Sequence, residues 1–450
     1  MSFFLDRKKN PETSKAQIFY FVTSIFDAMV VSFLTLFLNE CRASLKWSSF
    51  MSSLSLFLPP FSAALGVFIS SHFVSNHKKN LKTMRLVLLS LFLALLLLGL
   101  FGIFLPNGLN EEREIVSSFS YYLFYVLIVF LSSLFMGLYW SFASLHTCNI
   151  ADINYAEKTR YGHCCLYGSL APILFAPLAG LIAEGLFQTY KGFLFLFLVA
   201  SPILILLFFL TYIFKPFDSS LYHQDQDEKV SYRELLSNKT YLFYLFLASL
   251  WLPLMWASDS LTSSLWTALE GKEGVLNSFN PLSWGFYLAL AAFVEFLFVF
   301  FNTKVGFGKR VRFSMSLAFI ALTLLCVSLG TLSYFFNEAI PNDLPLAIGI
   351  IFLHSLRGAS SGLYLTSNIL MLHHIIGPKY RRKAVFLAPF LYQLINSILQ
   401  LIYPYLIGNR YISFYIFGGL ALLGLGLSFV LDVELLHRPN ISKEKEEIEN

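Results

Sequence analysis

The sequence has few charged residues and few cysteines. Asp, Glu, Lys and Arg make up 13% of its 450 residues, whereas a soluble domain carries roughly 25%. The MSFFLDRKKNPETSK start is polar and basic, and the apolar run after it is too long for a signal peptide, so no cleaved signal is expected. The spacing of the five cysteines fits neither a metal site nor a disulfide framework: Cys41, Cys148, Cys164, Cys165 and Cys326.

The motifs of ATP-driven pumps and of membrane enzymes are also missing. The sequence contains no Walker motif, no other Gly-rich phosphate loop and no His-x-x-x-x-Asp acyltransfer motif. The adjacent His373 and His374 are too isolated to indicate a metal site. We therefore expect no cofactor and no metal, and a polytopic membrane enzyme is the least favoured class of function.

What the sequence has in abundance is long apolar runs. Hydrophobic residues make up 56% of the chain, and its mean hydropathy is +0.65. A bilayer core needs about 20 apolar residues per helical span. Backbone groups in lipid must pair internally, and these runs are too long and too uniform for barrel strands, so each predicts a helix. The twelve runs are 17–39, 47–71, 84–105, 116–146, 161–186, 192–214, 240–266, 282–302, 313–335, 344–372, 384–407 and 411–432.

The distribution of Lys and Arg predicts how these helices are oriented. If the N-terminus is cytoplasmic, 25 of the 32 basic residues lie on the cytoplasmic side, six lie outside, and Arg357 lies within a span. This bias follows the positive-inside rule. It assigns the net charge of +5 to a membrane face, so nucleic acid is not needed to explain it. We predict an all-α integral membrane protein with twelve transmembrane helices and both termini cytoplasmic.

A polar connection divides the predicted helices into six and six. The stretch KPFDSSLYHQDQDEKVSYRELLSNK, residues 215–239, lies between the sixth and seventh spans. We expect six-helix bundles at 1–214 and 240–436, a cytoplasmic linker at 215–239 and a cytoplasmic tail at 437–450. An equal spacing in the two halves suggests a repeat. Met136 and Gly137 precede the basic turn residue Arg160 by 24 and 23 residues. Arg357 and Gly358 precede Arg381 by the same distances.

This organisation resembles the major facilitator superfamily. The family carries a Gly-x-x-x-Asp signature with basic residues in the loop between helices 2 and 3. Here GVFISSHFVSNHKK keeps Gly66 but has Ser70 in place of Asp, which puts the usual gating ion pair in doubt. The corresponding NTKVGFGKR between helices 8 and 9 keeps Gly306, Gly308, Lys309 and Arg310. The stretches VEFLFVFFNTKVGFGK and LHSLRGASSGLYLTSN are similar to helices 8 and 10 of sugar and nucleoside proton symporters.

Ionisable side chains inside the spans are the candidate site residues, because each costs about 2.5–3.5 kcal/mol to insert. Asp27 lies near the middle of the first span, Asp259 in the outer half of the seventh and Glu295 in the eighth. His354 and Arg357 lie one turn apart on the tenth, hence on one face. Three carboxylates and one permanent cation leave an excess of negative charge, so we expect at least one carboxylate to hold a proton near neutral pH.

Each candidate has an assigned role and a structural alternative. We expect Arg357, His354, Asp259 and Asp27 to bind substrate, and Glu295 and Asp27 to carry the coupling proton; for Glu295, His354 and Arg357 the resemblance implies a place in the substrate and proton site. Alternatively, Asp27 braces neighbouring helices, Asp259 meets outside water, and His354 bonds a carbonyl. The aromatic residues that could stack on a sugar or base are Tyr139, Trp140, Trp256, Trp266, Trp284 and Tyr364.

The sequence thus predicts a secondary transporter that works by alternating access. We expect a small polar organic solute (sugar, nucleoside or organic anion), protons as coupling ion, the lipid bilayer as surroundings and a monomer. We expect uptake, with the five candidates lining a central cavity. An exporter of drugs or metabolites and a transport-dead sensor are the alternatives with the same fold.

Overall fold

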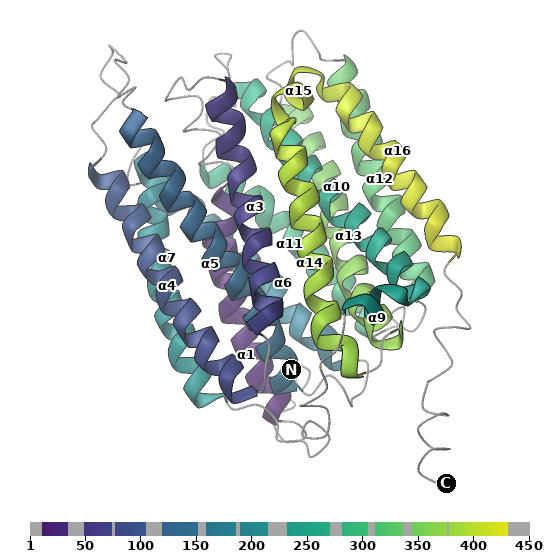
Figure 1. Cartoon of the computed structure of the whole chain (residues 1–450). Helices are drawn as coiled ribbons and strands as arrows, with labels where there is room; N and C mark the ends of the chain where they lie inside the picture. Colours follow the sequence, from purple (N-terminus) through teal and green to yellow (C-terminus); the bar gives the residue numbers. More distant parts are fainter. Residues whose placement is uncertain are drawn as a thin grey trace.

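The computed structural model of the protein is built from helices throughout the part that it describes. These residues are 11–34, 49–73, 77–104, 119–151, 159–185, 190–214, 232–270, 281–304, 311–335, 344–375 and 378–430. The helices run side by side, with those from the first half of the chain on the left of Figure 1 and those from the second half on the right.

The helices before residue 215 are α1 (Pro11–Phe26), the π-helical turn η1 (Asp27–Val31), α3 (Ser49–Phe73), α4 (His77–Phe104), α5 (Phe119–Ala151), α6 (Thr159–Gly185) and α7 (Tyr190–Ile213). Those after residue 231 are α9 (Tyr232–Ser237), α10 (Lys239–Glu270), α11 (Pro281–Lys304), α12 (Val311–Phe335), α13 (Leu344–Ile375), α14 (Pro378–Leu401), α15 (Tyr403–Gly408) and α16 (Arg410–Val430).

Ten spans among the described residues are long and apolar enough to cross a membrane, so the chain is an integral multi-pass membrane protein. They lie on α1 with η1, on α3 to α7, on α10 to α12 and on α16, and they coincide with ten of the predicted runs. The other predicted runs, 344–372 and 384–407, lie on α13 and on α14 with α15. Twelve crossings with cytoplasmic termini stay a prediction.

The predicted run 384–407 is not one helix. α14 ends at Leu401, Ile402 forms a turn, and α15 begins at Tyr403 with a proline in its first turn. Pro404 lacks the backbone N–H that a continuous helix would pair with the carbonyl of Gln400, and its ring would collide with that carbonyl. The apolar part of α14 is accordingly short, Phe386–Leu401.

The same helix pairs form in both halves of the chain. α3 packs on α5, α4 on α7 and α1 on α6, and, six predicted spans later, α11 packs on α13, α12 on α16 and α10 on α14. The two groups meet where α6 lies against α11 and α3 lies against α14. The latter pair runs through the middle of Figure 1. The repeated pairing favours the predicted two bundles, whose boundaries stay predictions.

Glycines allow the closest helix approaches, and one such contact recurs in each half. A Cβ on Gly137 of α5 would overlap the carbonyl oxygen of Ala63 on α3, and a Cβ on Gly358 of α13 would overlap that of Ala291 on α11. Gly137 and Gly358 are the glycines that the equal spacings pair. Small residues at these positions let the backbones touch, as is typical of helices packed in membranes.

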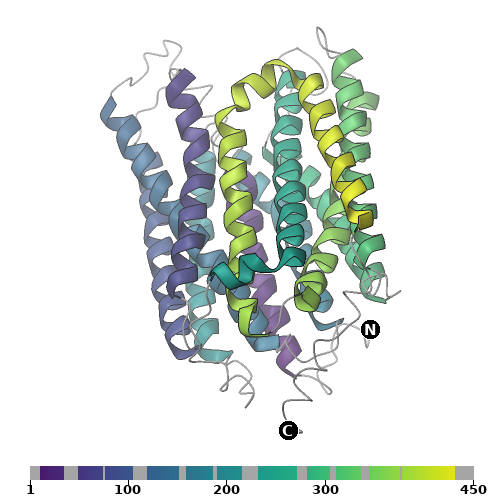
Figure 2. The ribbon, with the colours of Figure 1, turned by 45° about the vertical axis from the view of Figure 1, so that its right-hand side comes forward.

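The short helix α9 packs on α10 and α14 (Figure 2). It lies within the predicted linker, whose residues 215–231 lie outside the described part. The ring of Tyr232 lies 6.4 Å from the ring of His72 on α3, and the Lys383 ammonium of α14 lies 4.5 Å above it. Tyr232 therefore contacts α3 and α14 on either side of the seam between the two groups.

The signature loop is described only in part. Ser70, which stands where the family has Asp, is buried and donates its hydroxyl to the carbonyl of Gly66 at 2.9 Å. The residues 74–76 and 305–310, which hold the rest of the two loops, lie outside the described ranges.

We predict that Gly137→Ala destabilises the protein by about 1–3 kcal/mol, because the added methyl group forces α3 and α5 apart. The matched control is Gly349→Ala on α13, where an added Cβ meets no atom within 4 Å. Thermal unfolding of both purified variants in detergent tests this. Equal melting temperatures for the two variants would contradict the tight α3–α5 contact.

Candidate functional site

A cavity lies between the two groups of helices, with an empty volume of about 1120 Å³ that includes the open space at its mouth. Its wall is built by η1, α3 and α5 from the first half and by α10, α11, α13 and α14 from the second half. The wall combines apolar side chains with hydroxyl, amide, indole and charged groups, of which the polar ones are Ser32, Ser133, Trp140, Trp256, Asp259, Ser260, Trp284, Arg357, Gln393, Asn396 and Gln400.

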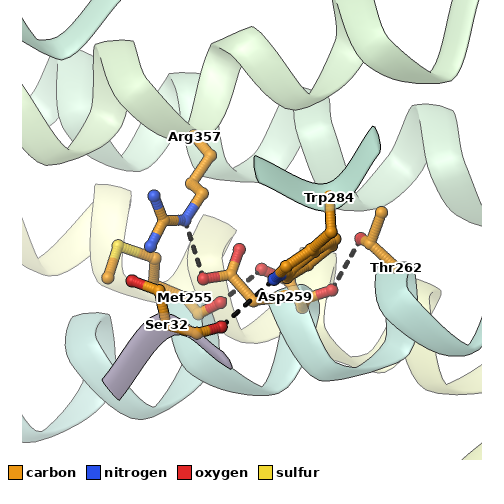
Figure 3. A network of polar contacts seen from close by, with 7 residues as sticks. Ser32, Met255, Asp259, Thr262, Trp284 and Arg357 are labelled. Carbon is orange, nitrogen blue, oxygen red and sulfur yellow. Dashed lines mark hydrogen bonds and ion pairs between the residues drawn. The ribbon is translucent and has the colours of Figure 1, made fainter. Parts of the chain in front are cut away.

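The charged groups of the wall are an ion pair between α10 and α13. Arg357 donates from Nε to Oδ2 of Asp259 at 2.7 Å, and the two side chains are 21% and 20% exposed (Figure 3). Oδ1 of Asp259 is buried and has no hydrogen-bond partner among the described residues. The nearby hydroxyls of Ser258 and Thr262 bond carbonyls of α10 itself. A carboxylate and a guanidinium are thus paired at a surface that a solute can reach.

Glu295 lies on α11 at the contact between the two groups. The hydroxyl of Ser169 on α6 donates to Oε1 of Glu295 at 2.7 Å. The backbone of Glu295 lies directly against Gly358, the residue that follows Arg357 in α13, so Glu295 and Arg357 sit on helices in close contact. Glu295 is not among the described residues that line the cavity.

Asp27 begins the π-helical turn that ends α1. Its Oδ1 accepts a hydrogen bond of 2.8 Å from the indole nitrogen of Trp140 on α5. Trp140 lines the cavity, whereas Asp27 is not among the described lining residues. Asp27 therefore acts on the cavity through an indole.

His354 is buried on α13, with 1% of its surface exposed. Neither ring nitrogen has a hydrogen-bond partner among the described residues. The imidazole stacks on Tyr287 of α11 at 3.6 Å, and Tyr287 stacks on Trp284 at 4.9 Å. The carbonyl bond that was the structural alternative for His354 is not seen in the described part, and a stack of rings connects His354 to the cavity wall.

The structure therefore separates the five predicted site residues. Asp259 and Arg357 face the cavity, while Asp27, Glu295 and His354 lie behind its wall. The latter three contact Trp140, Ser169 and Tyr287. Of the five residues expected to line one cavity, this wall contains Asp259 and Arg357, whereas the side chains of the other three are turned toward neighbouring helices. The substrate and proton roles of all five stay predictions.

The polar face of α14 was not predicted as part of the site. Gln393, Asn396 and Gln400 line the cavity, and their spacing of three and four residues puts them on one helical face. Their side-chain carbonyl oxygens are buried and have no described partner, although the amide nitrogen of Gln400 donates to Ser260 at 3.3 Å. The sequence does indicate this polar face, because three amides fall on one side of an apolar run. A search restricted to ionisable residues misses them.

Three of the predicted stacking residues are in the wall, namely Trp140, Trp256 and Trp284. Tyr364 instead stacks on Trp251 at 3.8 Å in the second group of helices, and Tyr139 is fully buried. The side chain of Trp266 lies outside the described part. The wall therefore offers indole faces beside amide groups and one ion pair.

Comparison of the chain with known sequences finds no matching family model and no matching curated protein. Solved structures do match. The xylose–proton symporter XylE of E. coli bound to 6-bromo-6-deoxy-D-glucose superposes with a TM-score of 0.66 and 14% identity, covering 93% of this chain and 95% of that one.

Two further matches are transporters as well. A mutant of the nucleoside transporter NupG has a TM-score of 0.62 and 11% identity, covering 95% of this chain and 100% of that one. An outward-facing bacterial homologue of the iron transporter ferroportin has a TM-score of 0.63 and 13% identity, covering 95% and 99%. With the helix pairing and the central cavity, these similarities show that the chain has the fold of the major facilitator superfamily transporters.

Proposed function

We propose that the protein is a secondary active transporter that moves a small polar organic solute across the membrane by alternating access and with protons. The observation that carries this proposal is the Asp259–Arg357 pair in the wall of a cavity between two groups of helices. An ion pair inside a membrane protein is costly to keep, and such charges mark substrate and ion pathways in general.

The chemistry of the cavity favours an uncharged solute over an organic anion. Arg357 already has a carboxylate partner at 2.7 Å, so an anion would have to displace Asp259 from it. The amides of Gln393, Asn396 and Gln400 offer both donors and acceptors. The indole faces suit a sugar ring or a nucleobase. Sugars and nucleosides are therefore the solutes that we favour, and the XylE and NupG matches support this choice.

A metal ion is a less suitable cargo, although one structural match is a ferroportin homologue. No group of three or more His, Cys, Asp or Glu side chains comes together in the described part of the chain. The cavity wall holds one carboxylate, which is already paired with Arg357, and its other polar groups are mostly amides, hydroxyls and indoles, which suit an organic solute better than a cation.

Glu295 is our first choice for the proton carrier. Its carboxylate accepts a bond from Ser169 across the α6–α11 contact, and its backbone lies against α13 next to Arg357. A proton on Glu295 changes the charge that Arg357 experiences and the bond that joins the two groups. Asp27 is the second choice, since its carboxylate holds the cavity residue Trp140.

Apolar contacts at the predicted cytoplasmic end support alternating access. Val67 and Leu145 of the first group pack with Phe386 and Phe390 of α14. A second cluster joins Cys165 of α6 to Val299 of α11. The cavity lies toward the opposite end, so these contacts close it from the cytoplasm in the predicted orientation. Inward opening requires that the clusters separate, which moves two bundles of six helices about the central site.

An uptake screen in proteoliposomes tests the function. We expect a sugar or a nucleoside to accumulate against its gradient when the outside is more acidic, and not when a protonophore removes the pH gradient. Protein-free liposomes are the control. If only carboxylates accumulate, the choice of an uncharged solute is overturned. If solute moves only as a loss of preloaded solute under the reversed gradient, the protein is an exporter. Absence of any transport would favour a sensor.

We predict that Glu295→Gln separates exchange from accumulation. The amide keeps an oxygen for the Ser169 bond but cannot carry a proton at neutral pH. Counterflow exchange of labelled solute should persist, while uphill accumulation should fall to the level without a pH gradient. The control is Ser169→Ala, which removes the bond and keeps the carboxylate. Full uphill uptake by Glu295→Gln would remove Glu295 from the coupling mechanism.

We also predict that the losses of stability caused by neutralising Asp259 and Arg357 are not additive. Asp259→Asn or Arg357→Gln alone leaves one charge unpaired, at a cost of about 3–5 kcal/mol in stability. The double variant should regain part of that cost, and it should still bind solute poorly. A thermal-unfolding double-mutant cycle with solute-binding assays measures both effects. Additive losses in stability would mean that the pair is not formed, and unchanged binding would place the solute site elsewhere.

A further inference from the structure

The π-helical turn at the end of α1 joins two indoles of the cavity wall. In this turn, Asp27–Val31, backbone hydrogen bonds span five residues instead of four. The backbone N–H of Ser32 accordingly bonds the carbonyl of Asp27, and the Ser32 hydroxyl lies 3.4 Å from the same oxygen. Such turns occur mostly as single interruptions of α-helices and often at functional sites.

A chain of hydrogen bonds runs through the turn from one group of helices to the other. Trp140 of α5 donates to the Asp27 carboxylate at 2.8 Å. Asp27 accepts through its carbonyl from the N–H of Ser32. The carbonyl of Ser32 in turn accepts from the indole of Trp284 on α11 at 3.1 Å (Figure 3). Both Trp140 and Trp284 line the cavity, and they belong to different groups of helices.

This chain needs the π turn. In a regular α-helix with 3.6 residues per turn, residues 27 and 32 lie about 140° apart around the axis. Asp27 and Ser32 would then face different neighbours, and the Ser32 N–H would bond residue 28 instead. The five-residue hydrogen bond instead pairs Ser32 with Asp27, so the residue that accepts from Trp140 of α5 is bonded to the residue that accepts from Trp284 of α11.

The indole of Trp284 is also fixed away from the turn, so a shift of the turn is not absorbed by free rotation of this ring. Trp284 stacks on Tyr287, which stacks on His354. Beside it, a Cβ on Gly285 would overlap the carbonyl of Ala176, so α11 lies directly on α6 there. A movement of the turn is therefore transmitted to the walls of the cavity.

We propose that the turn Asp27–Val31 is the positioning element of the cavity and that it sets Trp140 and Trp284 together. Asp27 is a positioning residue, because its carboxylate acts on the cavity through the indole of Trp140. The inference rests on the proposed function in one respect: the two indoles are taken to be the faces that the solute contacts. It assigns to Asp27 a task that needs a hydrogen-bond acceptor and needs no proton.

The test uses the full chain, labelled with 5-fluorotryptophan, in detergent and without solute. The chain has six tryptophans, and single Trp→Phe variants assign their fluorine resonances. In Asp27→Leu we expect the resonances of both Trp140 and Trp284 to move. In Asp27→Asn, whose amide oxygen still accepts the bond, both should keep their positions. The resonance of Trp251, which bonds Ser360 at 2.9 Å elsewhere, should stay in both variants.

Several outcomes would overturn the inference. A shift of Trp140 alone means that the turn does not connect the indoles, and a shift of neither means that Asp27 positions nothing. Equal shifts in Asp27→Asn and Asp27→Leu would assign the effect to the charge. If Asp27→Leu does not fold, Trp140→Phe replaces it: the Trp284 resonance should then move, and an unchanged resonance contradicts the proposal. These spectra need no transported solute, so their result is independent of the uptake screen.

Discussion

The constraint behind this structure is that lipid offers no hydrogen-bond partners. Backbone groups are therefore paired within helices, and a carboxylate in a span gains its hydrogen-bond donors from neighbouring helices. Asp27 finds an indole on α5, Glu295 a hydroxyl on α6, and Asp259 a guanidinium on α13. Each of these bonds joins two helices, so the groups that are proposed to serve transport also fix which helix faces lie against each other.

Much of the helical layout follows from the sequence, because a long apolar run has few alternatives in a membrane. The predicted runs coincide with helices, and the equal spacings paired the two glycines, Gly137 and Gly358, that allow the same close contact in each half. The break at Ile402 was missed, since Pro404 lies in an apolar run and its effect depends on where α14 ends. The π turn leaves no signal in composition or period.

The site was harder to predict than the helices. The cost of charge inside a span pointed to five candidates, and the structure brings two of them, Asp259 and Arg357, together as an ion pair in the cavity wall. Which of the other ionisable residues face the cavity depends on helix rotation, and that is set by packing, which a single sequence does not specify. The amides of α14 are uncharged, so a search for ionisable residues did not select them. Burying them is nevertheless costly, because lipid offers them no hydrogen-bond partners either.

The glycine contact that recurs in both halves places an apolar side chain on one side of the cavity and a charged side chain on the other. Met136 precedes Gly137 as Arg357 precedes Gly358, and both side chains reach the cavity wall. Equivalent positions thus present a thioether from one bundle and a guanidinium from the other. Under the proposed function, a solute with one apolar and one polar edge would gain most in a single orientation, because the two corresponding positions offer it different chemistry.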